Sequence, residues 1–228
     1  MNRPTPPTPS FPPCSMRPRA AWPACAALAL AAALSALPAL AQTPAAPAAR
    51  LAPADARISD QVISRDQAIY EAVQRRIEGL NDAGRPVRDY ALAKAQCWLD
   101  ASFHEYTRND RGAFPQAALA ESEKLVAAME TRPPAEALAL AQDTPRVNGA
   151  IRLRPDLWAA AAALKGAAGF ACAQQKTACA EVELAHAGNE YDQQRWRHAQ
   201  PYVQIAEDLL GEAAVLAARC AAPKAASR

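Results

Sequence analysis

The sequence lacks several features that would point directly to a function. It contains 8 glycines, and none forms a Gly-rich phosphate-binding loop or a Gly-x-Ser-x-Gly nucleophile turn. These two absences argue against nucleotide binding by a phosphate loop and against a hydrolase of the nucleophile-elbow type. No apolar run reaches the ~20 residues that a membrane-spanning helix needs. Strand-favouring residues are also few, whereas alanine is abundant, so helix is the expected secondary structure.

An excess of positive charge is missing once the N-terminus is set aside. The chain has 25 Lys and Arg against 23 Asp and Glu. Arg3, Arg17 and Arg19 precede residue 42 in a segment without acidic residues, which leaves 22 basic against 23 acidic side chains. Because nucleic-acid binders neutralise phosphates with an excess of Lys and Arg, we expect no nucleic-acid partner.

Residues 1–41 have the pattern of a secretory signal peptide, with Met16 as a possible true start. Arg17 and Arg19 precede the apolar run AALALAAALSAL, which is followed by an Ala-x-Ala cleavage pattern at Ala39–Ala41. The mature protein is therefore expected to be exported and soluble in the periplasm, with outer-membrane association as a further option. It would have no transmembrane segment after cleavage.

The rest of the chain is expected to form a single helical domain over residues 57–221. Residues 42–56 are rich in proline and alanine and are expected to form a linker, and residues 222–228 a loose tail.

Periodic apolar residues predict an all-α fold of about six helices in antiparallel hairpins, as a tetratricopeptide-like or an irregular bundle. The expected helices span residues 65–82, 88–108, 115–130, a segment starting at 156, 177–195 and 199–219. Residues 131–155 are the longest non-periodic stretch, with a short turn near 135–142. Such a loop either has a binding role or packs over the helices as a strap.

Two of the expected hairpins resemble each other. Residues 103–126 align with residues 188–210, and Glu105-Tyr106 matches Glu190-Tyr191. If the two hairpins pack side by side, their corners would form a basic and aromatic rim suited to an anionic partner or a glycan. The helix dipole alone also favours cations at these helix ends. The rim residues are Arg108, Arg111, Arg195, Trp196, Arg197 and His198.

Four cysteines follow the signal peptide, and an even number in an oxidising compartment predicts two disulfides among three possible pairings. We expect Cys172–Cys179 with Cys97–Cys220, because a helix starting near Thr177 would let the chain turn between the first two. Cys97–Cys172 with Cys179–Cys220 is the alternative. On one continuous helix, Cys172 and Cys179 would lie about 10.5 Å apart, beyond the ~7 Å reach of a disulfide.

The segment AKAQCWLDASFHEYTRND (residues 93–110) gathers residue types that are common in active sites. His104 follows Cys97 by seven residues, about 10.5 Å along a helix, which is too far to activate the thiol directly. Asp100 and His104 are four residues apart and are expected to form a local pair. The expected core positions are Leu99, Phe103 and Tyr106.

No catalytic group, metal site or cofactor is predicted. The three histidines lack the close spacing typical of metal ligands. Glu181 and Glu183 are two residues apart on a helix, so they point to different faces and do not form an acid–base pair.

Four strings resemble the N-terminal helical region of certain proteobacterial OmpA-like envelope proteins. They are DYALAKAQCWLDASFHEYTRND, VNGAIRLRPDLW, FACAQQKTACAEVELAHAGNEY and WRHAQPYVQIAEDL. The resemblance implies an envelope location and an accessory or scaffolding role. The sequence has no βα-rich segment that matches the C-terminal peptidoglycan-binding domain of those proteins, so peptidoglycan binding is assigned to no residue here.

Taken together, these patterns predict a non-enzymatic periplasmic accessory or scaffolding protein that binds an envelope protein or a peptidoglycan-related polymer through its hairpins. The alternative is a cell-wall-associated enzyme or redox accessory that uses Cys97 or the histidines. A third possibility is a carrier of a small ligand or metal.

Overall fold

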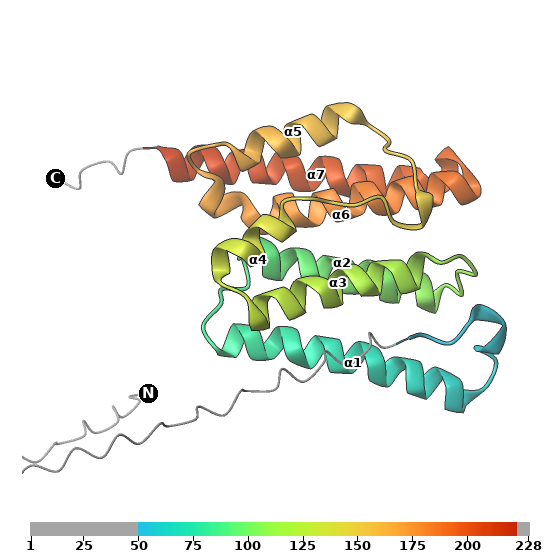
Figure 1. Ribbon diagram of the computed structural model, residues 1–228. Helices are drawn as coiled ribbons and strands as arrows, with labels where there is room; N and C mark the ends of the chain where they lie inside the picture. Colours follow the sequence, from blue (N-terminus) through green and yellow to red (C-terminus); the bar gives the residue numbers. More distant parts are fainter. Residues whose placement is uncertain (1–49, 223–228) are drawn as a thin grey trace, which may run out of the picture. The chain divides into compact units, whose positions relative to one another are not determined.

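The computed structural model describes residues 50–222, and the regular secondary structure in this part of the chain is all helical (Figure 1). Consecutive helices pack as antiparallel neighbours, which confirms the predicted all-α fold, although seven α-helices form where about six were expected. They are α1 (Asp60–Asp82), α2 (Tyr90–Thr107), α3 (Phe114–Thr131), α4 (Pro134–Ala141), α5 (Pro155–Lys165), α6 (Phe170–Gln194) and α7 (Trp196–Ala221). Two 3-10 turns complete the order: η1 (Ala54–Ala56) precedes α1, and η2 (Val147–Gly149) lies between α4 and α5.

The helix ends follow from local sequence. The Ser59 side chain accepts a hydrogen bond from the Val62 amide and begins α1, and the Asp89 carboxylate does the same for α2 through the Leu92 amide at 3.0 Å. Helix α5 begins with Pro155, a residue that has no amide hydrogen to leave unpaired there. The predicted ends of the first two helices are close to those observed, but α1 begins at Asp60, behind the Ser59 cap, rather than at residue 65.

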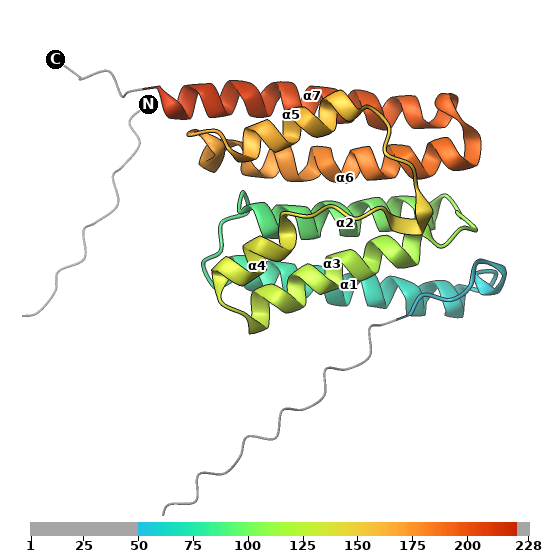
Figure 2. The ribbon, with the colours of Figure 1, turned by 45° about the horizontal axis from the view of Figure 1, so that its top comes forward.

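Helix α2 is the central element. Most of its residues are buried, because α1, α3 and α6 lie around it (Figure 2). Tyr90 and Trp98 are both almost completely buried. Contacts between α2 and α6 advance in the same direction along both helices, from Tyr90–Gln174 to Glu105–His186. The two central helices therefore run parallel.

The end of the expected linker is packed rather than loose. Leu51 and Ala52 are buried, and the Ala52 amide donates to both carboxylate oxygens of Asp66, at 3.1 and 3.0 Å. Tyr106 donates its hydroxyl to the same carboxylate at 3.1 Å. The prediction of a linker extending to residue 56 is therefore wrong for its last residues. The signal peptide, the start of the linker and the tail from residue 223 lie outside the described residues.

Residues 131–155 contain α4, at the position of the expected turn, and a strap (residues 142–154) that crosses α6. A Cβ added to Gly188 of α6 would lie 2.1 Å from the carbonyl oxygen of Ile151 in the strap. The approach of these two backbones therefore requires glycine at position 188. Thr144 and Val147 of the strap are buried, as a packed strap requires.

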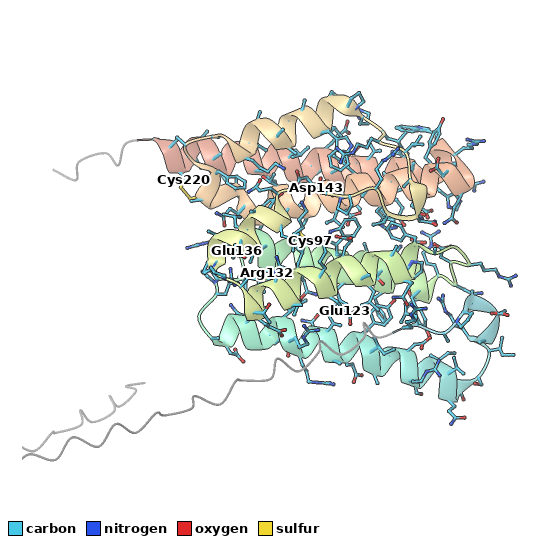
Figure 3. All side chains as sticks on the ribbon, viewed as in Figure 1. Cys97, Glu123, Arg132, Glu136, Asp143 and Cys220 are labelled. Carbon is cyan, nitrogen blue, oxygen red and sulfur yellow. A yellow bond between two sulfur atoms is a disulfide. The ribbon has the colours of Figure 1, made fainter. Side chains whose placement is uncertain are left out.

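Both disulfide predictions are wrong, because the structure joins Cys97 to Cys179 and Cys172 to Cys220. Helix α6 begins at Phe170 rather than near Thr177, so Cys172 and Cys179 lie on one continuous helix and are too far apart to pair. Cys179 faces α2 and Cys172 faces α7, so α6 is linked to both neighbours. Figure 3 shows Cys97 within the bundle and Cys220 near the end of α7.

Candidate functional site

The residues of the predicted rim lie on two adjacent turns. Arg108 ends α2, and Arg111 follows it in the turn to α3. Arg195 is the single residue between α6 and α7, and Trp196 begins α7. Both turns lie at the same end of the helices in Figures 1 and 2. All six rim residues are exposed except His198, which is half-buried.

Two hydrogen bonds join the turns into one surface. Arg108 Nη1 donates to the Tyr202 hydroxyl of α7 at 2.8 Å. Gln193 of α6 donates its side-chain amide to the buried Asp110 carboxylate at 3.2 Å. The two similar hairpins therefore meet at their corners.

The turn between α6 and α7 is conformationally strained. Arg195 has φ 63° and ψ −160°, a region populated almost only by glycine. A non-glycine residue there costs on the order of 1–3 kcal/mol. The arginine is therefore retained at a position where glycine would be more stable, and its neighbour Trp196 is 50% exposed. The turn therefore combines a strained arginine with an exposed tryptophan.

A buried polar cluster lies beneath the rim, and we call Glu105, His186 and Glu190 the histidine–glutamate cluster. His186 Nε2 lies 2.9 Å from Glu105 Oε1, and one ligand atom from each of the three side chains lies within 4.8 Å of the others. All three side chains are buried. The other two histidines of the sequence border the cluster. His198 Nδ1 lies 3.3 Å from Glu190 Oε2, and His104 Nε2 lies 3.7 Å from Glu105 Oε1.

The charges in this cluster shift one another's pKa values. Burial alone would lower the pKa of His186, but Glu105 and Glu183 raise it to about 9. Burial alone would raise the pKa of Glu105, but the hydrogen bond from His186 and its positive charge hold it below its usual value. Burial and the nearby Glu105 carboxylate raise the pKa of Glu190. The three groups thus form one electrostatic unit whose positive member is His186.

The predicted pair between Asp100 and His104 is wrong. Asp100 accepts a hydrogen bond from Gln96 at 2.9 Å, whereas His104 turns to the Tyr202 hydroxyl of α7 at 3.0 Å. A tertiary contact therefore replaces the local one. Of the three expected core residues, Leu99 and Tyr106 are buried, but Phe103 is 40% exposed.

A second buried network, which no sequence pattern predicted, joins α2 to α6. Lys94 is fully buried, and its ammonium group donates to Glu181 Oε2 at 2.9 Å and to Thr144 Oγ1 at 2.5 Å. Glu181 also accepts from Lys165 at 2.7 Å and from the Tyr90 hydroxyl. Burial lowers the pKa of Lys94 to about 8, with Glu181 opposing the shift. The saturated hydrogen bonding of both groups indicates a structural role.

One sequence pattern related Glu105 to Glu190 before the structure was known. The two residues occupy equivalent positions in the aligned hairpins. The alignment did not indicate that the two hairpins face each other, nor that all three histidines gather between them. Lys94 and Glu181, 87 positions apart, had no such signal, because neither residue lies in the two aligned segments.

Comparison of this chain with known proteins found no matching family model, no matching curated protein and no matching solved structure. The likeness to OmpA-like envelope proteins therefore stays a prediction. No helix in residues 50–222 is long and apolar enough to cross a membrane. The structure defines a disulfide-linked helical protein, and the two disulfides are consistent with an oxidising compartment outside the cytoplasm.

Proposed function

We propose that this chain is a non-enzymatic accessory protein of the cell envelope, located in the periplasm, that binds an anionic cell-wall polymer through its rim. The observation that carries the proposal is the exposed Arg195-Trp196-Arg197 turn, whose helix α7 is joined to the neighbouring corner by the hydrogen bond from Arg108 to Tyr202. Arginine and tryptophan are the residues that most often dominate binding energy at interfaces. Peptidoglycan carries carboxylates on its peptides and apolar ring faces on its sugars, which suit these two side chains.

The strain at Arg195 supports a binding role for this turn. Glycine would relieve the strain, so retaining arginine has a stability cost that a binding function would offset. The disulfides and the export pattern support an envelope location. An enzyme that uses Cys97 as its nucleophile would need a free thiol there. All four described cysteines are in disulfides, which argues against that alternative.

The test is co-sedimentation of the purified protein with isolated peptidoglycan sacculi at low and physiological salt. Arg197→Glu and Trp196→Ala should each reduce the pelleted fraction several-fold, and salt should weaken binding because exposed charges are screened. Arg132→Glu is the matched control, because Arg132 is exposed at the far end of α3 (Figure 3). This helix of 18 residues is about 27 Å long.

Equal sedimentation of the wild type and both rim variants would refute the proposal. Crosslinking in cells that enriches an acidic envelope protein, with no pelleting on sacculi, would also refute the polymer as the partner.

A further inference from the structure

The histidine–glutamate cluster has the composition of a divalent-metal site. Its donor atoms are one imidazole nitrogen and two carboxylate oxygens, contributed by α2 and α6. Such mixed nitrogen and oxygen donors suit Zn²⁺, which needs no thiolate when histidine and carboxylates are present. Because the described cysteines are all in disulfides, no described thiolate competes for the ion.

The spacing of the three donors fits a tetrahedral ion. Zn–N and Zn–O bonds of about 2.0–2.2 Å place neighbouring donors of a tetrahedral site about 3.3–3.6 Å apart. His186 Nε2 and Glu105 Oε1 are now at hydrogen-bond distance, 2.9 Å, and all three donors lie within 4.8 Å of one another. Side-chain shifts of a few tenths of an ångström to about one ångström would therefore complete the three-ligand arrangement.

The second nitrogen of His186 provides an independent observation. Nδ1 is buried and lies 3.4 Å from the buried Glu183 Oε2 atom, at ion-pair distance, and neither atom has a closer hydrogen-bond partner. In metal sites, a ligating histidine commonly donates its other N–H to a carboxylate, which fixes the ring's orientation. Glu183 lies where that partner is needed, so His186 is oriented with Nε2 facing Glu105 and Nδ1 facing Glu183.

The remaining ligands also have supporting groups. His198 Nδ1 lies 3.3 Å from Glu190 Oε2, and the Tyr202 hydroxyl lies 3.5 Å from Glu105 Oε1. The imidazoles of His198 and His104 are partly exposed, with side-chain exposures of 28% and 48%. The side of the cluster facing the rim is therefore the side from which an ion would enter.

The charge balance favours a cation at this position. Three carboxylates, those of Glu105, Glu183 and Glu190, surround a single buried imidazole. Within residues 50–222, no lysine or arginine forms an ion pair with any of the three. Arg108 contacts Tyr202 and His104, and its charge acts on Glu105 and Glu190 without pairing directly with either. Buried charges are normally paired or coordinate metals, and one divalent ion would supply the missing positive charge.

We propose that Glu105, His186 and Glu190 bind one Zn²⁺ ion, which displaces the proton of His186 Nε2 into solvent, with Glu183 orienting His186 and with the fourth coordination position facing the rim. The ion joins α2 to α6 and thereby holds the two hairpin corners together. This inference goes beyond the proposed polymer binding and does not depend on it.

The test is isothermal titration of the full, disulfide-intact protein with ZnCl₂ after treatment with a chelator. The wild type should bind one Zn²⁺ per chain. Glu105→Gln and Glu190→Gln keep the shapes of their side chains, and each should weaken binding at least tenfold. Glu212→Gln is the matched control, because it removes an exposed carboxylate from α7, away from the cluster, and it should leave the affinity unchanged. Thermal unfolding followed by circular dichroism establishes that each variant is folded.

Absorption by Co²⁺ keeps the proposal testable if a variant does not fold. The wild type should give the intense visible bands of a four-coordinate Co²⁺ ion, and added Zn²⁺ should abolish them. The proposal is overturned if the wild type shows no saturable Zn²⁺ binding, in which case the cluster is an ion-paired network alone. Equal affinity in a folded Glu105→Gln/Glu190→Gln protein, or tighter binding of Mn²⁺ than of Zn²⁺, would also overturn it.

Discussion

Replacing Glu181 with glutamine removes the carboxylate that pairs with the buried Lys94 and that also accepts from Lys165 and Tyr90. Lys94 is 0% exposed, and Glu181 is its carboxylate partner at 2.9 Å. Removing one member of a buried ion pair typically costs about 3–5 kcal/mol, because the other charge stays buried without compensation. The lysine can limit this loss by releasing its proton. From an ordinary pKa of 10.5, that release costs about 4.8 kcal/mol at pH 7, at 1.36 kcal/mol per unit. We therefore expect Glu181→Gln to lose about 3–5 kcal/mol at pH 7.

The same substitution should show a distinctive pH dependence. Burial lowers the pKa of Lys94, and removing Glu181 lowers it further because Glu181 opposes that shift. The unfolded chain keeps its proton up to a pKa near 10.5, so between pH 7 and pH 9 the unfolded state of the variant binds more protons than the folded state. Stability of the variant therefore rises with pH in this window. The deficit relative to the wild type should shrink between pH 7 and pH 9.

Urea unfolding followed by circular dichroism, with the disulfides intact, measures both effects. The expected loss corresponds to about 6–20 °C in melting temperature for a domain of this size. Glu71→Gln is the control, because its ion pair with Arg75 is exposed, and it should change stability by less than about 0.5 kcal/mol. A loss below about 1 kcal/mol at pH 7, or a deficit that grows at pH 9, would refute the assignment of Lys94 as a buried charge that depends on Glu181.

Three further perturbations test other parts of the fold by the same unfolding measurements. Replacing both members of the Cys97–Cys179 disulfide with alanine opens a loop with a sequence separation of 82 and should cost up to about 4.5 kcal/mol in the chain-entropy model. Gly188→Ala should destabilise the protein, because its Cβ would overlap the strap's backbone, whereas Gly211→Ala in the open interior of α7 should stabilise it by about 0.5–1 kcal/mol. Arg195→Gly should stabilise the protein by about 1–3 kcal/mol and weaken binding to sacculi.

Each of these predictions has a contradicting result. An unchanged urea midpoint in the alanine double variant would mean that the disulfide adds nothing to stability. Equal effects of the two glycine substitutions would mean that the strap does not approach α6 as described. Lower stability of Arg195→Gly would show that the turn is not strained, and unchanged binding would remove Arg195 from the rim's function.

Much of the architecture follows from local pattern. Caps such as Ser59 and Asp89 mark helix starts, and periodic apolar residues mark the buried faces. The alignment of the two hairpins also indicated that Glu105 and Glu190 occupy equivalent positions. The disulfide prediction failed for a local reason as well, because residues 170–176 continue α6 where a turn was expected.

By itself, the sequence determined that the chain is helical, that its expected mature part is nearly neutral, and that its four described cysteines can form two disulfides. Only the tertiary structure decided which cysteines pair, that Lys94 is paired with Glu181, and that the histidine–glutamate cluster exists. The physical reason is that helix formation depends on neighbours within about one turn, whereas these contacts depend on how α2 and α6 pack. Residues as far apart as Glu105 and His186 meet because two buried helices lie side by side. The spacing of the two residues along the chain does not predict that contact.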